Sequence, residues 1–119
     1  MQLDNGVSMM NYVSRERPQL GVAMKTTATI LGRDGISTVS DGTATPLGPV
    51  WTDRNGSPYF TTWQVEIPEH QASIEVVSLV PGQAFEETVR VYEGIARASG
   101  TFAGSTVSGT AWLEQRLLG

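Results

Sequence analysis

Glycine and proline interrupt this sequence so often that only short extended segments can form between them. The 119 residues include 13 Gly and 6 Pro, and the intervening segments are rich in Val, Ile, Thr and aromatic residues, which favour strands. No window shows the i, i+3, i+4, i+7 apolar spacing of an amphipathic helix. The best helical candidate, Gln83–Glu87, is one turn at most. The sequence therefore predicts an all-β protein.

Turn signals mark where the strands should begin and end. Asn5-Gly6 predicts a two-residue hairpin, because a type I′ turn needs positive φ at both positions, and Asp34-Gly35 predicts a second hairpin. Further turns are expected at Asn55–Pro58, Pro68–Gln71 and Pro81-Gly82. We expect strands near residues 2–4, 7–14, 20–31, 36–40, 50–52, 59–67, 73–80 and 106–117, and one more that contains Val89, Val91 and Ile95.

About eight short strands in up-and-down order favour an antiparallel β-barrel, because closing a sheet removes its exposed edges. A β-sandwich is the alternative. An eight-stranded barrel is just wide enough to be filled by its own side chains or to hold one small ligand. The length fits a single domain over residues 1–119. The first strand has barely three residues before its turn, which is short and indicates either a fragment of a longer protein or a barrel with one incomplete strand.

Composition excludes several classes of function. The 8 basic and 12 acidic residues give a net charge of −4, which argues against nucleic-acid binding, since that requires clustered Lys and Arg. The chain has no Cys and one His, so we expect no disulfide, no cysteine nucleophile and no metal site built from these ligands. The segment 53–56 begins like a calcium loop but lacks the later ligands. We therefore predict no bound metal.

No segment is long and apolar enough to be a membrane-spanning helix. The N-terminal residues lack the basic and apolar regions of a signal peptide. The absence of cysteine fits a reducing compartment, which favours the cytoplasm. His70 lies in the predicted Pro68–Gln71 turn, where we expect it to be solvated.

Five segments, taken in order, resemble one family. QLDNGVSMMNYVSR is similar to an opening hairpin with the pattern strand, Asp-Asp-Gly, Leu-Met-Leu-Tyr, Arg. The lone Trp51 is followed by SPYFTTWQVEIP, which is close to a Tyr-Pro-x-x-Trp strand that ends in Ile-Pro. VYEGIARASG resembles a Tyr-Trp-Glu-Gly strand, and SGTAWLEQ resembles a closing Gly-x-Gly-Tyr-x-Glu strand. Together they resemble the AttH-like, lipocalin-like family that includes the carotenoid 1,2-hydratases (hydroxyneurosporene synthases), and the chain is similar to the second of two tandem barrels.

The resemblance implies a lipocalin-like barrel that handles a lipophilic ligand, such as an isoprenoid or a polyene. It also implies chemistry without a cofactor, because members add water to a prenyl double bond and relatives cyclise polyenes or assist cycloadditions. The chain would then be a hydratase (a lyase) or a cyclase or isomerase, with a partner barrel or a second copy beside it. Two alternatives remain: a non-catalytic module that binds a hydrophobic ligand, and a structural barrel that packs on a partner domain.

Glu93 is the candidate acid for such a reaction. Protonating an alkene requires a carboxyl group that stays neutral near pH 7, which desolvation achieves by raising its pKa. Glu93 has the same parity as Val91 and Ile95, the apolar side of its strand. Gly94 beside it allows a bulge or a close backbone approach that re-aims the side chain. The alternative is that Glu93 faces water or pairs with an arginine.

Glu114 and Asp4 are further candidates for catalysis. Glu114 matches the family's glutamate in the closing strand, although its parity with Trp112 also fits a solvent-facing position. Asp4 precedes a turn, which it would cap through an Asx-type hydrogen bond unless it is catalytic. Aromatic faces would stabilise a carbocation and methionine would give a pliable lining, although core packing explains the same side chains. The predicted ligand-binding residues are Trp51, Trp63, Tyr92, Trp112 and Met24.

Overall fold

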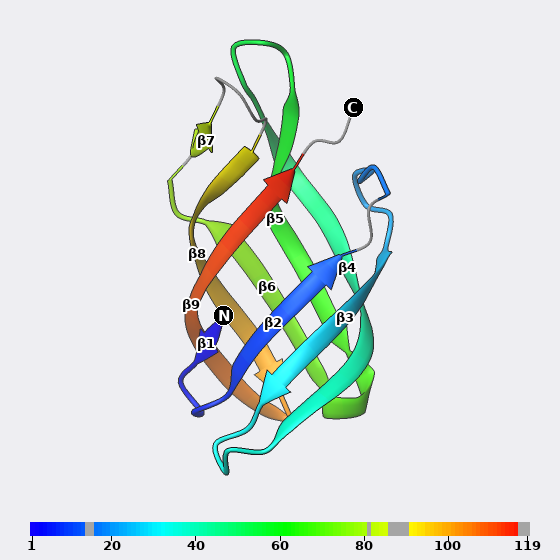
Figure 1. The fold of residues 1–119 in the computed structure, drawn as a ribbon, viewed down its shortest axis with the longest axis vertical. Coiled ribbons are helices and arrows are strands. Elements are labelled where there is room, and N and C mark those ends of the chain that lie inside the picture. Colours follow the sequence, from blue (N-terminus) through cyan, green and yellow to red (C-terminus); the bar gives the residue numbers. More distant parts are fainter. Residues whose placement is uncertain (14–15, 81, 86–90, 117–119) are drawn as a thin grey trace.

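The computed structural model describes residues 1–13, 16–80, 82–85 and 91–116, which form one antiparallel sheet (Figure 1). Among these residues the only helical turn is the 3₁₀ helix η1 (Pro68–His70), and no helix is long and apolar enough to cross a membrane. The all-β prediction is therefore confirmed. The strands are β1 (Gln2–Leu3), β2 (Ser8–Val13), β3 (Met24–Leu31), β4 (Ser37–Thr52), β5 (Pro58–Ile67), β6 (Ala72–Ser78), β7 (Ala84–Phe85), β8 (Val91–Phe102) and β9 (Ser105–Arg116).

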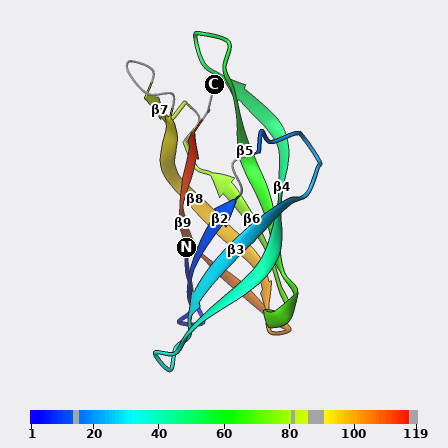
Figure 2. The same cartoon turned by 45° about the vertical axis from the view of Figure 1, so that its right-hand side comes forward.

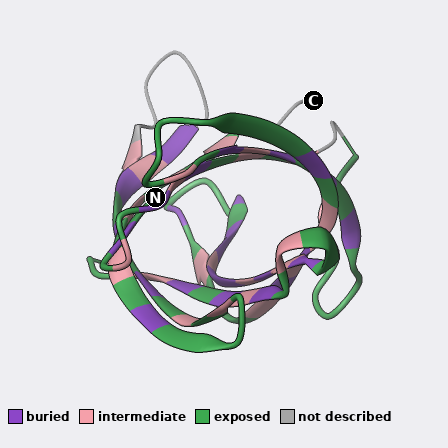
Figure 3. Cartoon of the chain, turned by 90° about the horizontal axis from the view of Figure 1, so that it is seen from below, coloured by how far each residue is buried: buried purple, intermediate pink, exposed green. Residues whose placement is uncertain are grey.

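The sheet closes on itself. Strands β1 to β6 lie next to one another in chain order, β9 pairs with β1, and β8 pairs with β9. The ladder between β6 and β8, from Ser73↔Thr101 to Ser78↔Ala96, completes the ring, which Figure 3 shows from below. Of the nine strands in the sheet only β7 lies outside this ring, which leaves a barrel of eight. The predicted barrel is confirmed, and the β-sandwich alternative is wrong.

The hairpin turns lie where the sequence placed them, but their type differs. At the first turn, the Gly6 N–H donates to the Leu3 carbonyl oxygen at 3.1 Å and the Leu3 N–H donates to the Val7 carbonyl oxygen at 2.9 Å. Gly6 has a φ of 84°, whereas Asn5 does not have a positive φ. This is a type I turn followed by a left-handed glycine, which joins strands through three residues and not through the two of the predicted type I′ turn.

One strand is longer than the sequence indicated. We expected separate strands at 36–40 and 50–52, but β4 runs through both, past Pro46 and Pro49, and reaches the top of the barrel together with β5 (Figure 2). The Pro46 carbonyl oxygen accepts from the Gly21 N–H at 2.7 Å. The backbone N and C=O groups of Pro46 therefore point away from β5. Proline there removes no bond from the β4–β5 ladder, and a bulge between Leu47 and Val50 accommodates the second proline.

The predicted helical turn is wrong over its described part. Ala84 and Phe85 form β7, which pairs with Tyr92 and Val91 of β8. Glu86, Glu87 and Val89 lie outside the described residues.

Three inward-facing glycines, Gly42, Gly100 and Gly109, sit where a neighbouring strand comes very close. A Cβ atom on Gly100 of β8 would collide with the carbonyl oxygen of Ser73 on β6. A Cβ atom on Gly42 of β4 would collide with the backbone carbonyl oxygen of Glu66 on β5. A Cβ atom on Gly109 of β9 would collide with the carbonyl oxygen of Gln2 on β1. The strands of a narrow barrel bend strongly, and glycine permits this close approach of two backbones.

Gly42→Ala should therefore lower the free energy of unfolding by about 1–3 kcal/mol, the usual cost of overpacking. Urea unfolding followed by circular dichroism measures the change. Ser37→Ala, at an exposed position of the same strand, is the control and should shift stability by less than about 0.5 kcal/mol. A Gly42→Ala protein as stable as the control would show that β4 and β5 are not in this close contact.

Candidate ligand-binding interior

The interior of the barrel is lined by alternate residues of its strands, and most of these are apolar. On β3, Met24, Thr26, Ala28 and Ile30 form the buried inward row, and Met24, Ala28 and Ile30 belong to one hydrophobic cluster, while the alternate residues face outward. Trp63 of β5 belongs to the same cluster and packs edge-on against Phe60, with ring centroids 6.1 Å apart. Met24 and Trp63 therefore lie where a ligand-lining residue has to lie, although packing alone also explains them.

Thr26, Ser40 and Asn11 are polar residues of the inward rows, and Thr26 and Ser40 have hydrogen-bond partners. Asn11 differs from these two. It alternates with Met9, a buried member of the cluster, and with Val13, which packs against the cluster. Both polar atoms of the Asn11 amide are buried, and neither has a hydrogen-bond partner among the described residues. A buried unpaired polar group costs about 1–3 kcal/mol, so this amide can form hydrogen bonds with a molecule inside the barrel. The sequence signal was a polar residue in phase with Met9 and Val13, which we did not single out.

Three aromatic rings pack together near the end of the barrel where β4 ends and β5 begins. Tyr92 of β8 is fully buried, and its ring centroid lies 5.5 Å from that of Tyr59 and 6.0 Å from that of Trp51. The Tyr92 hydroxyl is fixed by Ser78 Oγ at 2.6 Å and by the Val80 carbonyl oxygen at 3.3 Å. Two predicted ligand residues, Trp51 and Tyr92, thus come together near this end.

Gln115 joins opposite parts of the wall at the same end. Its Nε2 donates to the Phe60 carbonyl oxygen at 2.7 Å, and its Oε1 accepts from the Phe60 N–H at 3.0 Å. The side-chain amide thus pairs with the β5 backbone as a strand would, at a position that β6 does not reach because its ladder with β5 ends at Thr62↔Val77. Gln115 could not be identified from the sequence, because its partner lies 55 residues away along the chain.

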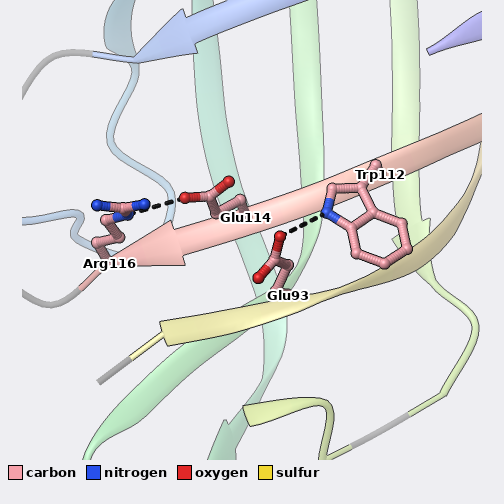
Figure 4. Close-up of polar contacts among 4 residues, drawn as sticks. All are labelled: Glu93, Trp112, Glu114 and Arg116. Carbon is pink, nitrogen blue, oxygen red and sulfur yellow. Dashed lines mark hydrogen bonds and ion pairs between the residues drawn. The ribbon is translucent and has the colours of Figure 1, made fainter. Parts of the chain in front are cut away.

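Glu93, the predicted acid, has the opposite orientation to the one expected. On β8 the buried inward positions are Tyr92, Gly94 and Ala96, so Glu93 and Ile95 face outward. Glu93 is half-buried, and its Oε1 accepts a hydrogen bond from Trp112 Nε1 at 3.2 Å on the outer face (Figure 4). The predicted inward orientation is wrong. The expected inward orientation of Glu93 depended on its sharing a row with apolar Ile95. Ile95 instead lies on the outer face, where it pairs with Trp112 of β9.

The neighbouring candidates on β9 also face outward. Trp112 is 59% exposed. The prediction that it lines an internal pocket is therefore wrong. Glu114 Oε1 accepts from Arg116 Nε at 2.8 Å in an exposed ion pair (Figure 4), as the solvent-facing alternative predicted. Gly94 does allow a close approach, because the Gln83 side-chain amide lies against it. Gln83 Oε1 accepts from the Ile95 N–H at 3.1 Å.

Asp4 connects the β1–β2 hairpin to β9 through hydrogen bonds. Its carboxylate accepts from the Ser108 N–H and from Ser108 Oγ, both at 3.2 Å. The Asx-type bond that we expected of Asp4 is made by its neighbour, because Asn5 Oδ1 accepts from the Val7 N–H at 3.0 Å.

The remaining titratable side chains lie at the ends or on the outside of the barrel. Asp53, in the turn after β4, is the buried carboxylate among the described residues, and its Oδ1 accepts from the Asn55 and Ser57 N–H groups at 2.9 and 2.8 Å. Glu69 of η1 is exposed, and its Oε2 accepts from the buried Ser40 hydroxyl at 2.8 Å. His70 is half-buried, with Nε2 3.1 Å from Ser40 Oγ and its ring stacked on Phe102, so the expectation of a solvated histidine is wrong. Burial lowers the pKa of the Met1 amine. The described residues contain no group of three or more His, Asp or Glu side chains that could hold a metal ion.

Comparison with known proteins shows the fold. No family model and no curated protein matches the chain. The structure is similar to the crystal structure of kievitone hydratase from Nectria haematococca, with a TM-score of 0.72 and 20% sequence identity. The match covers 91% of this chain but 33% of that one, so the chain spans about a third of its structural neighbour. At this identity the likeness establishes a shared barrel fold and no more.

Gln115→Ala should lower the free energy of unfolding by about 1–3 kcal/mol, because the Phe60 N–H and carbonyl lose their partner. Glu114→Ala, on the exposed side of the same strand, is the matched control and should change stability by less than about 1 kcal/mol. Chemical denaturation of both variants measures the difference. Equal losses would show that the bridge to Phe60 contributes nothing.

Proposed function

We propose that the barrel binds a largely apolar small molecule that carries one hydrogen-bonding group, and that Asn11 binds this group. The observation that carries the proposal is the buried Asn11 amide, which has no partner among the described residues. Ligand sites typically combine an apolar lining with a few polar groups that orient the ligand. Asn11 among Met9, Met24 and Trp63 fits this description.

Two further features support a lipophilic ligand. The inward positions Ala96 and Ala98 of β8 carry small side chains, which take up little of the interior. The family resemblance of the sequence implies an isoprenoid or a polyene, and the neighbouring fold is that of a hydratase. An isoprenoid alcohol, with an apolar body and one hydroxyl, is the simplest molecule of this class.

The placement of the carboxylates favours binding over catalysis. Glu93 and Glu114 lie on the outer face and Asp4 is bound to Ser108. Protonation of an alkene requires an acid within hydrogen-bond reach of the reacting carbon, and the described part of the lining offers no carboxyl group. Binding without chemical change is therefore the function that the geometry supports best.

Hydration is the second candidate, and the likeness to kievitone hydratase favours it. In that reaction a proton adds to one alkene carbon and the oxygen of water to the other. Incubation of the protein with kievitone, followed by mass spectrometry, tests it. A product heavier by one water would establish hydratase activity and overturn the binding-only proposal.

The binding proposal is tested with geraniol and with the hydrocarbon of the same carbon skeleton. Asn11→Leu should weaken geraniol binding about tenfold, which corresponds to one hydrogen bond of about 1.4 kcal/mol. Hydrocarbon binding should change by less than about twofold, because that ligand cannot form the bond. Isothermal titration calorimetry gives both affinities.

Tyr12→Leu is the control, because Tyr12 lies on the outer face of the same strand and is 62% exposed. It should leave both affinities unchanged. Equal loss of geraniol and hydrocarbon binding in Asn11→Leu, or no binding of either ligand by the unaltered protein, would refute the role of Asn11.

A further inference from the structure

The Asn11 side chain has two different polar groups to satisfy. Its oxygen Oδ1 and its nitrogen Nδ2 are both buried, and neither has a hydrogen-bond partner among the described residues. The oxygen is an acceptor and the NH₂ group is a donor. Because a buried polar group of either kind is costly to leave unpaired, a ligand that binds one of them still leaves the cost of the other.

The polar side chains of the neighbouring inward rows are bound elsewhere. Strands β2, β3 and β4 lie side by side (Figure 1), and Asn11 pairs in register with Ala28, which pairs with Ser40. Thr26 of β3 donates its hydroxyl proton to the Tyr12 carbonyl oxygen at 2.9 Å. The Ser40 hydroxyl donates to a carboxylate oxygen of η1 at 2.8 Å. The protein thus supplies neither of these hydroxyl protons to the Asn11 oxygen.

The residue directly opposite Asn11 on β3 is small. Ala28 is fully buried in the inward row, and its side chain is a single methyl group. Opposite residues on neighbouring strands have Cβ atoms about 5 Å apart, and the longer Asn11 side chain extends beyond that methyl group. Ala28 therefore leaves the amide accessible from the interior on the β3 side.

The charged groups of the barrel strands determine that the bound group is neutral. The described Lys and Arg residues of the strands are Lys25, Arg97 and Arg116, and all three are exposed at outward positions. An anion inside the barrel would have no counter-charge from these residues, and burying an unpaired charge costs far more than burying a neutral polar group. A carboxylate or a phosphate is therefore a poor partner for Asn11.

We infer that the ligand carries an uncharged carboxamide, either primary or in a lactam ring, that forms two parallel hydrogen bonds with Asn11. This inference rests on the proposed function. The ligand N–H donates to Asn11 Oδ1, and the ligand carbonyl oxygen accepts from Asn11 Nδ2. Donor and acceptor lie side by side in both groups, as in the paired bonds between an asparagine and the edge of adenine. A single hydroxyl cannot align with both atoms of the Asn11 amide.

Ligands with one carbon skeleton test the inference. Geranamide offers a donor beside an acceptor, N,N-dimethylgeranamide offers an acceptor alone, geraniol offers one hydroxyl, and geranic acid is an anion at neutral pH. Geranamide should bind at least about fivefold more tightly than each of the others, because it alone satisfies both Asn11 atoms without a buried charge. Isothermal titration calorimetry with the unaltered protein gives the four affinities.

Proton NMR of the Asn11 side-chain NH₂ group gives a second readout that needs no variant. One of its two proton resonances should move downfield when geranamide binds, because that proton is donated to the ligand carbonyl oxygen. The hydrocarbon of the same skeleton should produce no such shift, since it has no acceptor.

Two variants locate the preference. In Asn11→Leu, geranamide should bind no more tightly than geraniol, because neither ligand then finds a polar partner at this position. Tyr12→Leu, on the outer face of the same strand, should keep the fivefold preference for geranamide. Circular dichroism establishes that both variants are folded.

Two results would overturn the carboxamide and leave the proposed function standing. The first is that geranamide binds no more tightly than geraniol while Asn11→Leu still weakens geraniol binding. The second is a preference for geranamide that persists in Asn11→Leu, since another group would then recognise the carboxamide. If the unaltered protein binds none of these ligands, the proposed function and this inference are both refuted.

Discussion

The ladder between β6 and β8 joins Ser73–Ser78 to Ala96–Thr101 and turns an up-and-down sheet into a closed barrel. Closure forces each strand to bend around a narrow axis, and neighbouring backbones then meet closely at Gly42 and Gly109. It also divides every strand into an inner and an outer row of side chains. The apolar inner row supplies the core, while the polar groups that remain in it require a specific partner.

That division gives the two faces of the same wall different side chains. Asn11 faces inward, with an unpaired amide in an apolar lining, and this supports a site for a small lipophilic molecule. Trp112 faces outward and is exposed, as are Met10 and Tyr12 on the outer face of β2. Glu93 contributes to the outer face, because its carboxylate holds Trp112 in place there.

Much of the fold could be predicted from local patterns. Asn5-Gly6 and Asp34-Gly35 marked hairpins correctly, because glycine is favoured where φ must be positive. The alternation of Trp63, Val65 and Ile67 identified the inner row of β5, since its opposite row is polar there. The site was less predictable. Both rows of β8 carry apolar residues, so the sequence did not show that Ile95 and Glu93 face outward.

By itself, the sequence determined the all-β class, the positions of the main turns and the absence of cysteine-based chemistry, because these depend on residue type and on near neighbours. Tertiary structure alone decided which row of each strand lies inside and which polar groups are paired. Gln115 forms hydrogen bonds with Phe60, which lies 55 residues away in the sequence. β1 pairs with β9, which lies more than 100 residues away. Such contacts form only when the sheet closes, and a pattern with a period of two residues carries no information about them.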